Sequence, residues 1–115
     1  MTSLTPATVV RADDLHLVHE MLPADQVVAG TPATALVELG RFSGVDIGVW
    51  EMTPGTATDV EADEVFVVLS GRARIRFTDP TLAPIDVAAG DIVRLEAGMH
   101  TEWTVTETLR KVYLA

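Results

Sequence analysis

The residues of this chain with the chemistry for metal binding or acid–base catalysis are mostly carboxylates, 17 Asp and Glu against three histidines and no cysteine. Asp59, Glu61 and Glu64 lie close together in the sequence, whereas the three histidines lie elsewhere, at positions 16, 19 and 100. His16 and His19 are spaced i, i+3, which could place both on one face of a helical turn, but surface histidines are the simpler interpretation. One or two carboxylates without imidazole form a poor transition-metal site and too small a ligand set for calcium.

The elements that would position these residues are short strands. From residue 34 onward, β-rich runs are separated by turn residues at the spacing typical of sandwiches and barrels. Gly, Pro and Asp form the breaks, because Gly allows positive φ, Pro fixes φ and Asp bonds its own backbone. No window has a helical period with caps, so the pattern predicts an all-β fold. The expected strands are Ala35–Leu39, Val45–Met52, Val65–Leu69, Ala73–Phe77, Ile85–Val87, Ile92–Leu95, Thr101–Thr106 and Leu109–Leu114.

The chain of 115 residues is long enough for one core. Residues 1–33 are less regular, and we expect an N-terminal arm with one or two short strands that packs on a barrel formed by residues 34–115. The run Val65–Leu69 is apolar on both faces. Both faces should therefore be covered, by a closed barrel with an additional layer or by a dimer interface.

Several short motifs follow one another at defined spacings in the second half of the chain. Six residues separate Glu64 from Gly71, and Gly90-Asp91 is followed, five residues after Gly90, by Glu96-Ala97-Gly98. These spacings are similar to the paired cupin motifs, glutamate-x6-glycine and glycine-x5-proline-x-glycine. The resemblance implies a double-stranded β-helix, the jelly-roll barrel of the RmlC-like superfamily, which closes most sheet edges.

Finer features resemble the small single-domain cupins related to (S)-ureidoglycine aminohydrolase and the ethanolamine-utilisation cupin domains. The resemblance covers about three quarters of the chain. The matching segments are Val27–Pro32, Gly48-Val49-Trp50-Glu51-x-x-Pro54-Gly55, Gly98-Met99-x-x-x-Trp103 and Arg110-Lys111-Val112-Tyr113.

Many cupins hold a divalent metal through two histidines, a glutamate and a third histidine, all pointing into the barrel. Here residues 57–63 contain no histidine, and the position of the third histidine falls on Thr101. His100 is adjacent, but neighbouring residues of a strand face opposite sides. We therefore expect neither a tightly bound catalytic metal nor another cofactor. The alternative is a divalent metal (Mn, Zn, Ni or Fe) with Glu64 and His100 as ligands.

The family pattern also implies which side chains face the barrel interior and could bind a ligand. These residues are Trp50, Glu64, Phe66, Trp103, Lys111 and Tyr113. A buried carboxylate must be paired, and Lys111 is the best candidate partner for Glu64. If the two did not pair, burial would favour the neutral acid, and Glu64 could act as a general acid or base. Glu64 and Lys111 are thus the candidate catalytic residues; the alternative is a filled core in which Glu64 caps a turn.

Composition limits the partners. The formal charge of −9 repels phosphate backbones, and Arg72, Arg74 and Arg76 alternate along one strand as on a solvated face, so we expect no nucleic acid. The chain has no cysteine for disulfides or thiolate zinc sites, and no apolar stretch long enough for a membrane. It also lacks the features of a signal peptide, so we expect a cytoplasmic protein. We expect a homodimer because the apolar run Val65–Leu69 and the apolar arm need cover, and cyclic dimers are the commonest oligomers.

Three functions remain open from the sequence. The first is a module that binds a small polar metabolite in the barrel without a metal. The second is a metal-dependent enzyme acting on a ureido or amide nitrogen compound, like ureidoglycine aminohydrolase. The third is a structural dimerising barrel, which requires a barrel interior filled by side chains.

Overall fold

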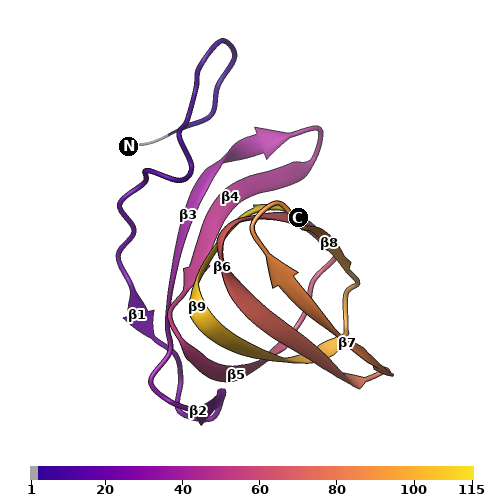
Figure 1. Cartoon of the computed structure of the whole chain (residues 1–115). Helices are drawn as coiled ribbons and strands as arrows, with labels where there is room; N and C mark the ends of the chain where they lie inside the picture. Colours follow the sequence, from indigo (N-terminus) through magenta and orange to yellow (C-terminus); the bar gives the residue numbers. More distant parts are fainter. Residues whose placement is uncertain (1–2) are drawn as a thin grey trace.

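The chain forms an all-β jelly-roll barrel, as the strand pattern predicts (Figure 1). We analysed a computed structural model, which describes residues 3–115. Within that range there is no helix long and apolar enough to cross a membrane. The strands are β1 (Glu20–Met21), β2 (Val27–Ala29), β3 (Ala33–Phe42), β4 (Val45–Met52), β5 (Gly55–Val60), β6 (Glu64–Asp79), β7 (Thr81–Ala88), β8 (Ile92–Leu95) and β9 (His100–Leu114).

Two long bent strands, β6 and β9, organise the barrel. They pair antiparallel along most of their length. The first half of β9 also pairs with β5 and its second half with β4, while β6 pairs with β8 and then β7. The barrel therefore closes around these two strands (Figure 1).

Each long strand was expected from the sequence as two shorter strands, and this was wrong. The expected break at Ser70-Gly71 is a bulge, where the β6–β9 register shifts between Val68 and Ala73. Gly71 has φ +93°, and a Cβ there would overlap the backbone of Thr108 on β9. The glycine thus permits a close crossing of two strands instead of ending one. Strand β5 was also missed.

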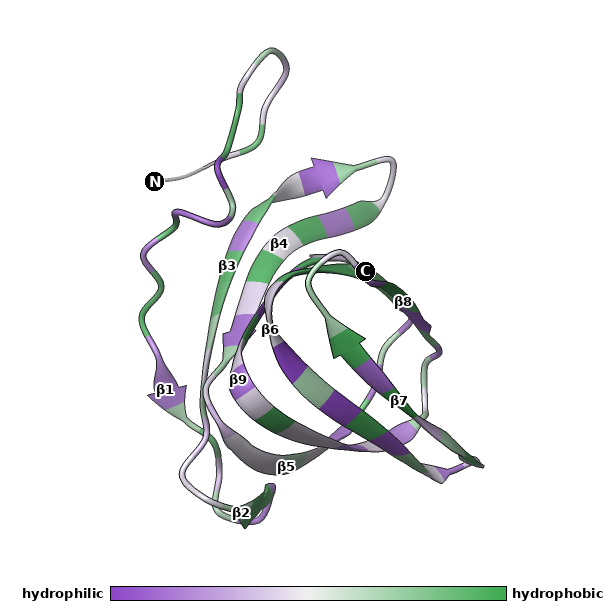
Figure 2. Cartoon of the chain, in the orientation of Figure 1, coloured by the Kyte–Doolittle hydropathy of each residue, from purple (hydrophilic) through white to green (hydrophobic). Residues whose placement is uncertain are grey.

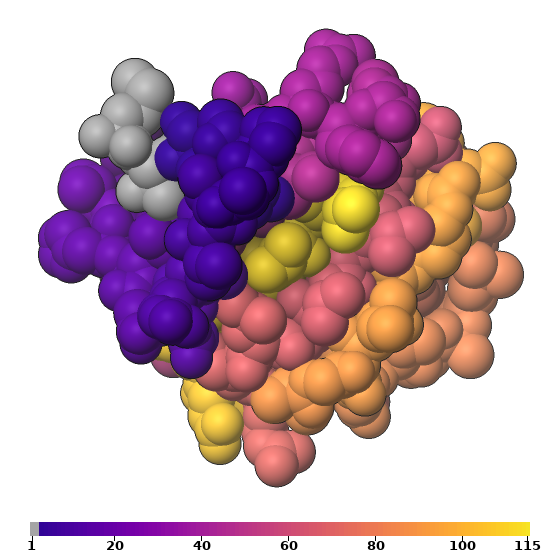
Figure 3. Space-filling view, turned by 90° about the horizontal axis from the view of Figure 1, so that it is seen from above, coloured from indigo at the N-terminus to yellow at the C-terminus, as the bar shows by residue number. Residues whose placement is uncertain are grey.

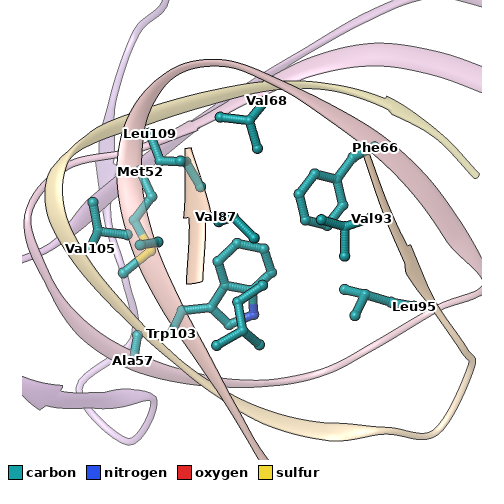
Figure 4. Packing of buried hydrophobic residues seen from close by; sticks show 12 residues of the cluster. Met52, Ala57, Phe66, Val68, Val87, Val93, Leu95, Trp103, Val105 and Leu109 are labelled. Atoms are coloured by element: carbon teal, nitrogen blue, oxygen red, sulfur yellow. The ribbon is translucent and has the colours of Figure 1, made fainter. Parts of the chain in front are cut away.

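Alternation along the strands separates the core from the surface (Figure 2). Phe66 and Val68 of β6 are buried inside the barrel, as are Trp103 and Val105 of β9. Figure 4 shows these side chains converging with those of β4, β5, β7 and β8. Period-two alternation on β6 and β9 therefore fills one part of the barrel with a packed apolar core.

The N-terminal arm lies outside the barrel, along β3 and β4 (Figures 1 and 3). Its two short strands pair with the barrel, β1 with β3 and β2 with β5. Leu17 of the arm is buried against Ala35, Leu39 and Val49, which form a second apolar cluster on the outer face. The arm does not cover the whole outer face, because Val65 of β6 is 36% exposed in the single chain.

Candidate ligand pocket

A cavity of about 410 Å³ opens into the barrel beside the apolar core. Its volume is within the range of small-molecule sites. Both tryptophans of the chain contribute to its wall, together with a tyrosine and several charged side chains. The lining residues with aromatic or ionisable side chains are Trp50, Trp103, Tyr113, Lys111, Glu64, Glu61, Asp59, Asp46 and Glu38.

Lys111 pairs with Glu64 in the wall of this pocket. The Lys111 Nζ donates a hydrogen bond to Glu64 Oε2 over 2.6 Å, and both side chains are largely buried. This is the ion pair that the sequence analysis expected. A buried carboxylate needs a partner of opposite charge, and Lys111 neutralises Glu64. Lys111 is the only lysine of the chain.

Three aromatic rings surround the same ammonium. The Lys111 Nζ lies 4.6 Å from the ring centroid of Trp50, 4.3 Å from that of Phe66 and 4.9 Å from that of Trp103. Trp50 is directly opposite Lys111 in the β4–β9 register. Cation–π contacts in a desolvated setting are worth about 2 kcal/mol, so the rings hold the lysine in addition to Glu64.

Of the six ligand-binding residues expected from the sequence, five line the cavity. Phe66 does not: it is fully buried and touches the pocket through Lys111 and through Trp103, whose ring centroid is 5.7 Å away. It packs behind the wall because it belongs to the core cluster. Phe66 therefore supports the site and is not a contact surface.

Glu61 is a second buried carboxylate in the pocket, and it has no cationic partner among residues 3–115. Its Oε2 accepts hydrogen bonds from Thr101 Oγ1 at 2.5 Å and from Trp103 Nε1 at 3.0 Å. Thr101 occupies the inward position next to His100, which is exposed. From the sequence, Glu61 was a candidate only as an oxygen ligand for a metal; the structure shows that the uncharged side chains of Thr101 and Trp103 donate hydrogen bonds to it.

Asp59 lies two residues before Glu61 and lines the same pocket. Partial burial raises the pKa of Asp59, and the negative charge of Glu61 raises it further. A backbone hydrogen bond from Val60 at 2.8 Å opposes this shift. The pocket therefore has an end at which two carboxylates repel each other.

Asp59→Asn should stabilise the free protein at neutral pH. With a folded-state pKa above the unfolded value, the charged form is disfavoured by folding, so the wild type gains stability as pH falls through that folded pKa. The expected gain for the variant is under about 1 kcal/mol, because the side chain is partly solvated. Thermal melts from neutral to acidic pH would check it: the advantage of Asp59→Asn should shrink as pH falls, and a constant difference would contradict it.

The residues present do not fit the metal centre that many cupins hold. Glu64 is taken by Lys111, the third-histidine position holds Thr101, and His100 is exposed on the opposite side of the strand. Within residues 3–115 no group of three or more histidines, aspartates or glutamates could hold a metal ion. In the alternative with Glu64 and His100 as ligands, Glu64 is bonded to Lys111 and His100 is exposed.

A second polar cluster lies on the outer face and was missed in the sequence. Arg110 Nε donates to Glu51 Oε1 at 2.8 Å, and His19 Nε2 lies 2.6 Å from Glu51 Oε2. Arg110 Nη1 also donates to the backbone carbonyls of Ala12, Asp13 and Leu15. This cluster ties the arm to β4 and β9, and no local pattern in the sequence marks it.

The comparisons with known proteins identify the family. The family described as EutQ-like cupin domain matches residues 39–113, more than half of the chain. The chain belongs to this family. No curated protein matches this EutQ-like cupin domain, so the finer resemblance to ureidoglycine aminohydrolase has no support from the comparisons.

Solved structures agree with the fold. A protein of unknown function from Pseudomonas syringae is 23% identical with a TM-score of 0.72, over 88% of this chain and 44% of that one. The EutQ protein of Clostridium difficile is 17% identical with a TM-score of 0.61, over 72% and 61%. A putative ethanolamine utilization protein Q from Salmonella typhimurium is 16% identical with a TM-score of 0.63, over 87% and 94%. The EutQ-like domain thus spans less than two thirds of the first two proteins.

Proposed function

We propose that this EutQ-like cupin domain binds a small polar metabolite inside its barrel, without a tightly bound catalytic metal. The main support is the cavity, whose wall combines two tryptophans with an ion pair between Lys111 and Glu64. Mostly apolar walls with a few placed polar groups are typical of small-molecule sites. A purely structural barrel would fill this space with side chains.

The Lys111–Glu64 pair favours binding over catalysis by these two residues. Each charge already neutralises the other, and three rings hold the ammonium in place. Lys111 bonds only to Oε2 of Glu64, and Oε1 has no hydrogen-bond partner among residues 3–115. The pair can therefore present Oε1 to a ligand in a fixed position. It is poorly suited to release a proton.

A thermal-shift screen against a metabolite panel should find compounds that raise the melting temperature, since a ligand that binds only the folded state stabilises it. Ala62→Phe places a bulky side chain at an exposed lining position and should abolish the shift. Ala83→Phe, exposed on β7 away from the cavity, is the matched control and should keep it. A shift that survives Ala62→Phe would contradict binding in the barrel.

We also propose that the domain is cytoplasmic and forms a homodimer through the outer face of β6, β8 and β9. Val65 and its register partner Leu114 are 36% and 37% exposed there, and Ile92, paired with Val67, is 72% exposed. A second copy would cover this apolar row. Light scattering at micromolar concentration should give a dimer mass, with Ile92→Glu shifting it to the monomer; a monomeric wild type would contradict the proposal.

A further inference from the structure

The pocket contains more carboxylates than cations among the residues that the structure describes. Lys111 is the only lining residue with a positive charge, and its Nζ forms an ion pair with Glu64 Oε2 at 2.6 Å. Asp59 and Glu61 line the same cavity, and neither forms an ion pair within residues 3–115. The Asp59–Glu61 end of the pocket therefore carries negative charge that no ion pair in this part of the chain neutralises; the charge of Lys111 lowers the pKa of Asp59, but burial and Glu61 raise it by more.

Both carboxylates have oxygens available to a ligand. The two hydrogen bonds to Glu61 end on Oε2, and no buried polar side-chain atom among the described residues lacks a partner, so Glu61 Oε1 is accessible from the cavity. The backbone bond to Asp59 uses Oδ1 only. Ionised carboxylates are acceptors only, so a ligand must bring donors to this end.

Lys111 cannot move to supply that charge. Its ammonium is bonded to Glu64 and lies within 4.9 Å of three ring centroids, and the residue is 5% exposed. Swinging toward Asp59 would leave Glu64 buried and unpaired, which costs several kcal/mol. A positively charged ligand would therefore neutralise Asp59 and Glu61 at a lower free-energy cost than a movement of Lys111.

We infer that the ligand is a small organic cation, a primary ammonium or a guanidinium compound, whose N–H groups bond to Asp59 and Glu61 while its carbon chain lies along Trp103 and Met52. This inference rests on the proposed function and specifies its ligand class. Attraction between charges is strengthened in a partly enclosed site. The apolar wall formed by Trp103, Met52 and Ala57 suits an organic chain better than a hydrated metal ion.

Tryptophan fluorescence offers a direct test, since Trp50 and Trp103 both line the cavity and Trp103 Nε1 donates to Glu61. The probes are n-butylamine, n-butanol and butyrate, which share a carbon chain and differ in charge. At neutral pH butylammonium should bind at least about tenfold more tightly than butanol, and butyrate should not bind. Added salt should weaken the butylammonium affinity.

Variants then locate the charge. Asp59→Asn and Glu61→Gln should each weaken butylammonium binding at least about fivefold and leave butanol binding unchanged. Both keep the acceptor oxygens that hold Val60 and Trp103, so both should fold, which circular dichroism would verify. Glu96→Gln, at an exposed carboxylate outside the pocket, is the matched control and should bind like the wild type.

Three results would overturn the inference. Equal binding of butanol and butylammonium would leave the proposed function intact and remove the charge preference. Competition by Mg²⁺ or Ca²⁺ that depends on Asp59 and Glu61 would assign this end to a metal cation. If no probe changes the fluorescence and no compound of the metabolite panel shifts the melting temperature, the proposed function itself fails.

Discussion

Replacing Lys111 by methionine should lower the free energy of unfolding by about 3–5 kcal/mol, because it leaves the carboxylate of Glu64 buried without a cation. Glu64→Leu should cost less, since the ammonium of Lys111 would keep its contacts with Trp50, Phe66 and Trp103. The double variant should recover most of the loss. Urea denaturation of the wild type, both single variants and the double variant would measure this coupling.

The control for this cycle is an exposed ion pair. Arg94 lies 3.4 Å from Asp63, and both side chains are more than half exposed. Arg94→Met should therefore change the free energy of unfolding by less than about 1 kcal/mol. If the effects of Lys111→Met and Glu64→Leu simply add, the two residues do not stabilise each other.

Arg110→Met should release the N-terminal arm and also cost about 3–5 kcal/mol. The substitution leaves Glu51 buried without its guanidinium and removes the donor to three arm carbonyls, which would then need water. Detachment of the arm would expose the outer cluster around Leu17 and Val49. Two measurements apply: urea denaturation, and the rate of trypsin cleavage after Arg11 in the arm.

Arg74→Met is a matched control, because Arg74 makes two bonds to Asp86 at 2.8 and 3.1 Å on an exposed face. It should leave both the free energy of unfolding and the cleavage after Arg11 close to those of the wild type. The stability lost by Arg110→Lys should lie between the losses of Arg110→Met and Arg74→Met, since an ammonium cannot reach Glu51 and the arm carbonyls at once. Wild-type stability and cleavage in Arg110→Met would show that the arm is held by its apolar contacts alone.

Much of the barrel follows from local sequence patterns. Alternation puts Phe66 and Val68 inside and Val65 outside, because side chains of a strand point to opposite faces in turn. The pairing of Glu64 with Lys111 was also predictable, since the chain has one lysine and a buried carboxylate needs a cation. These features depend on residue type and period, which the sequence contains directly.

The tertiary structure decided the rest. Positive φ at Gly71 is compatible with a turn and with a bulge, and only the crossing with β9 selects the bulge. Arg110 and Glu51 are 59 positions apart in the sequence. The arm that they hold has no regular alternation of apolar residues from which its contacts could be predicted. Asp59, in β5, and Glu61, just after that strand, differ from other carboxylates because both line one cavity. Burial and long-range pairing, which a linear pattern does not encode, thus determine which charged side chains line the cavity.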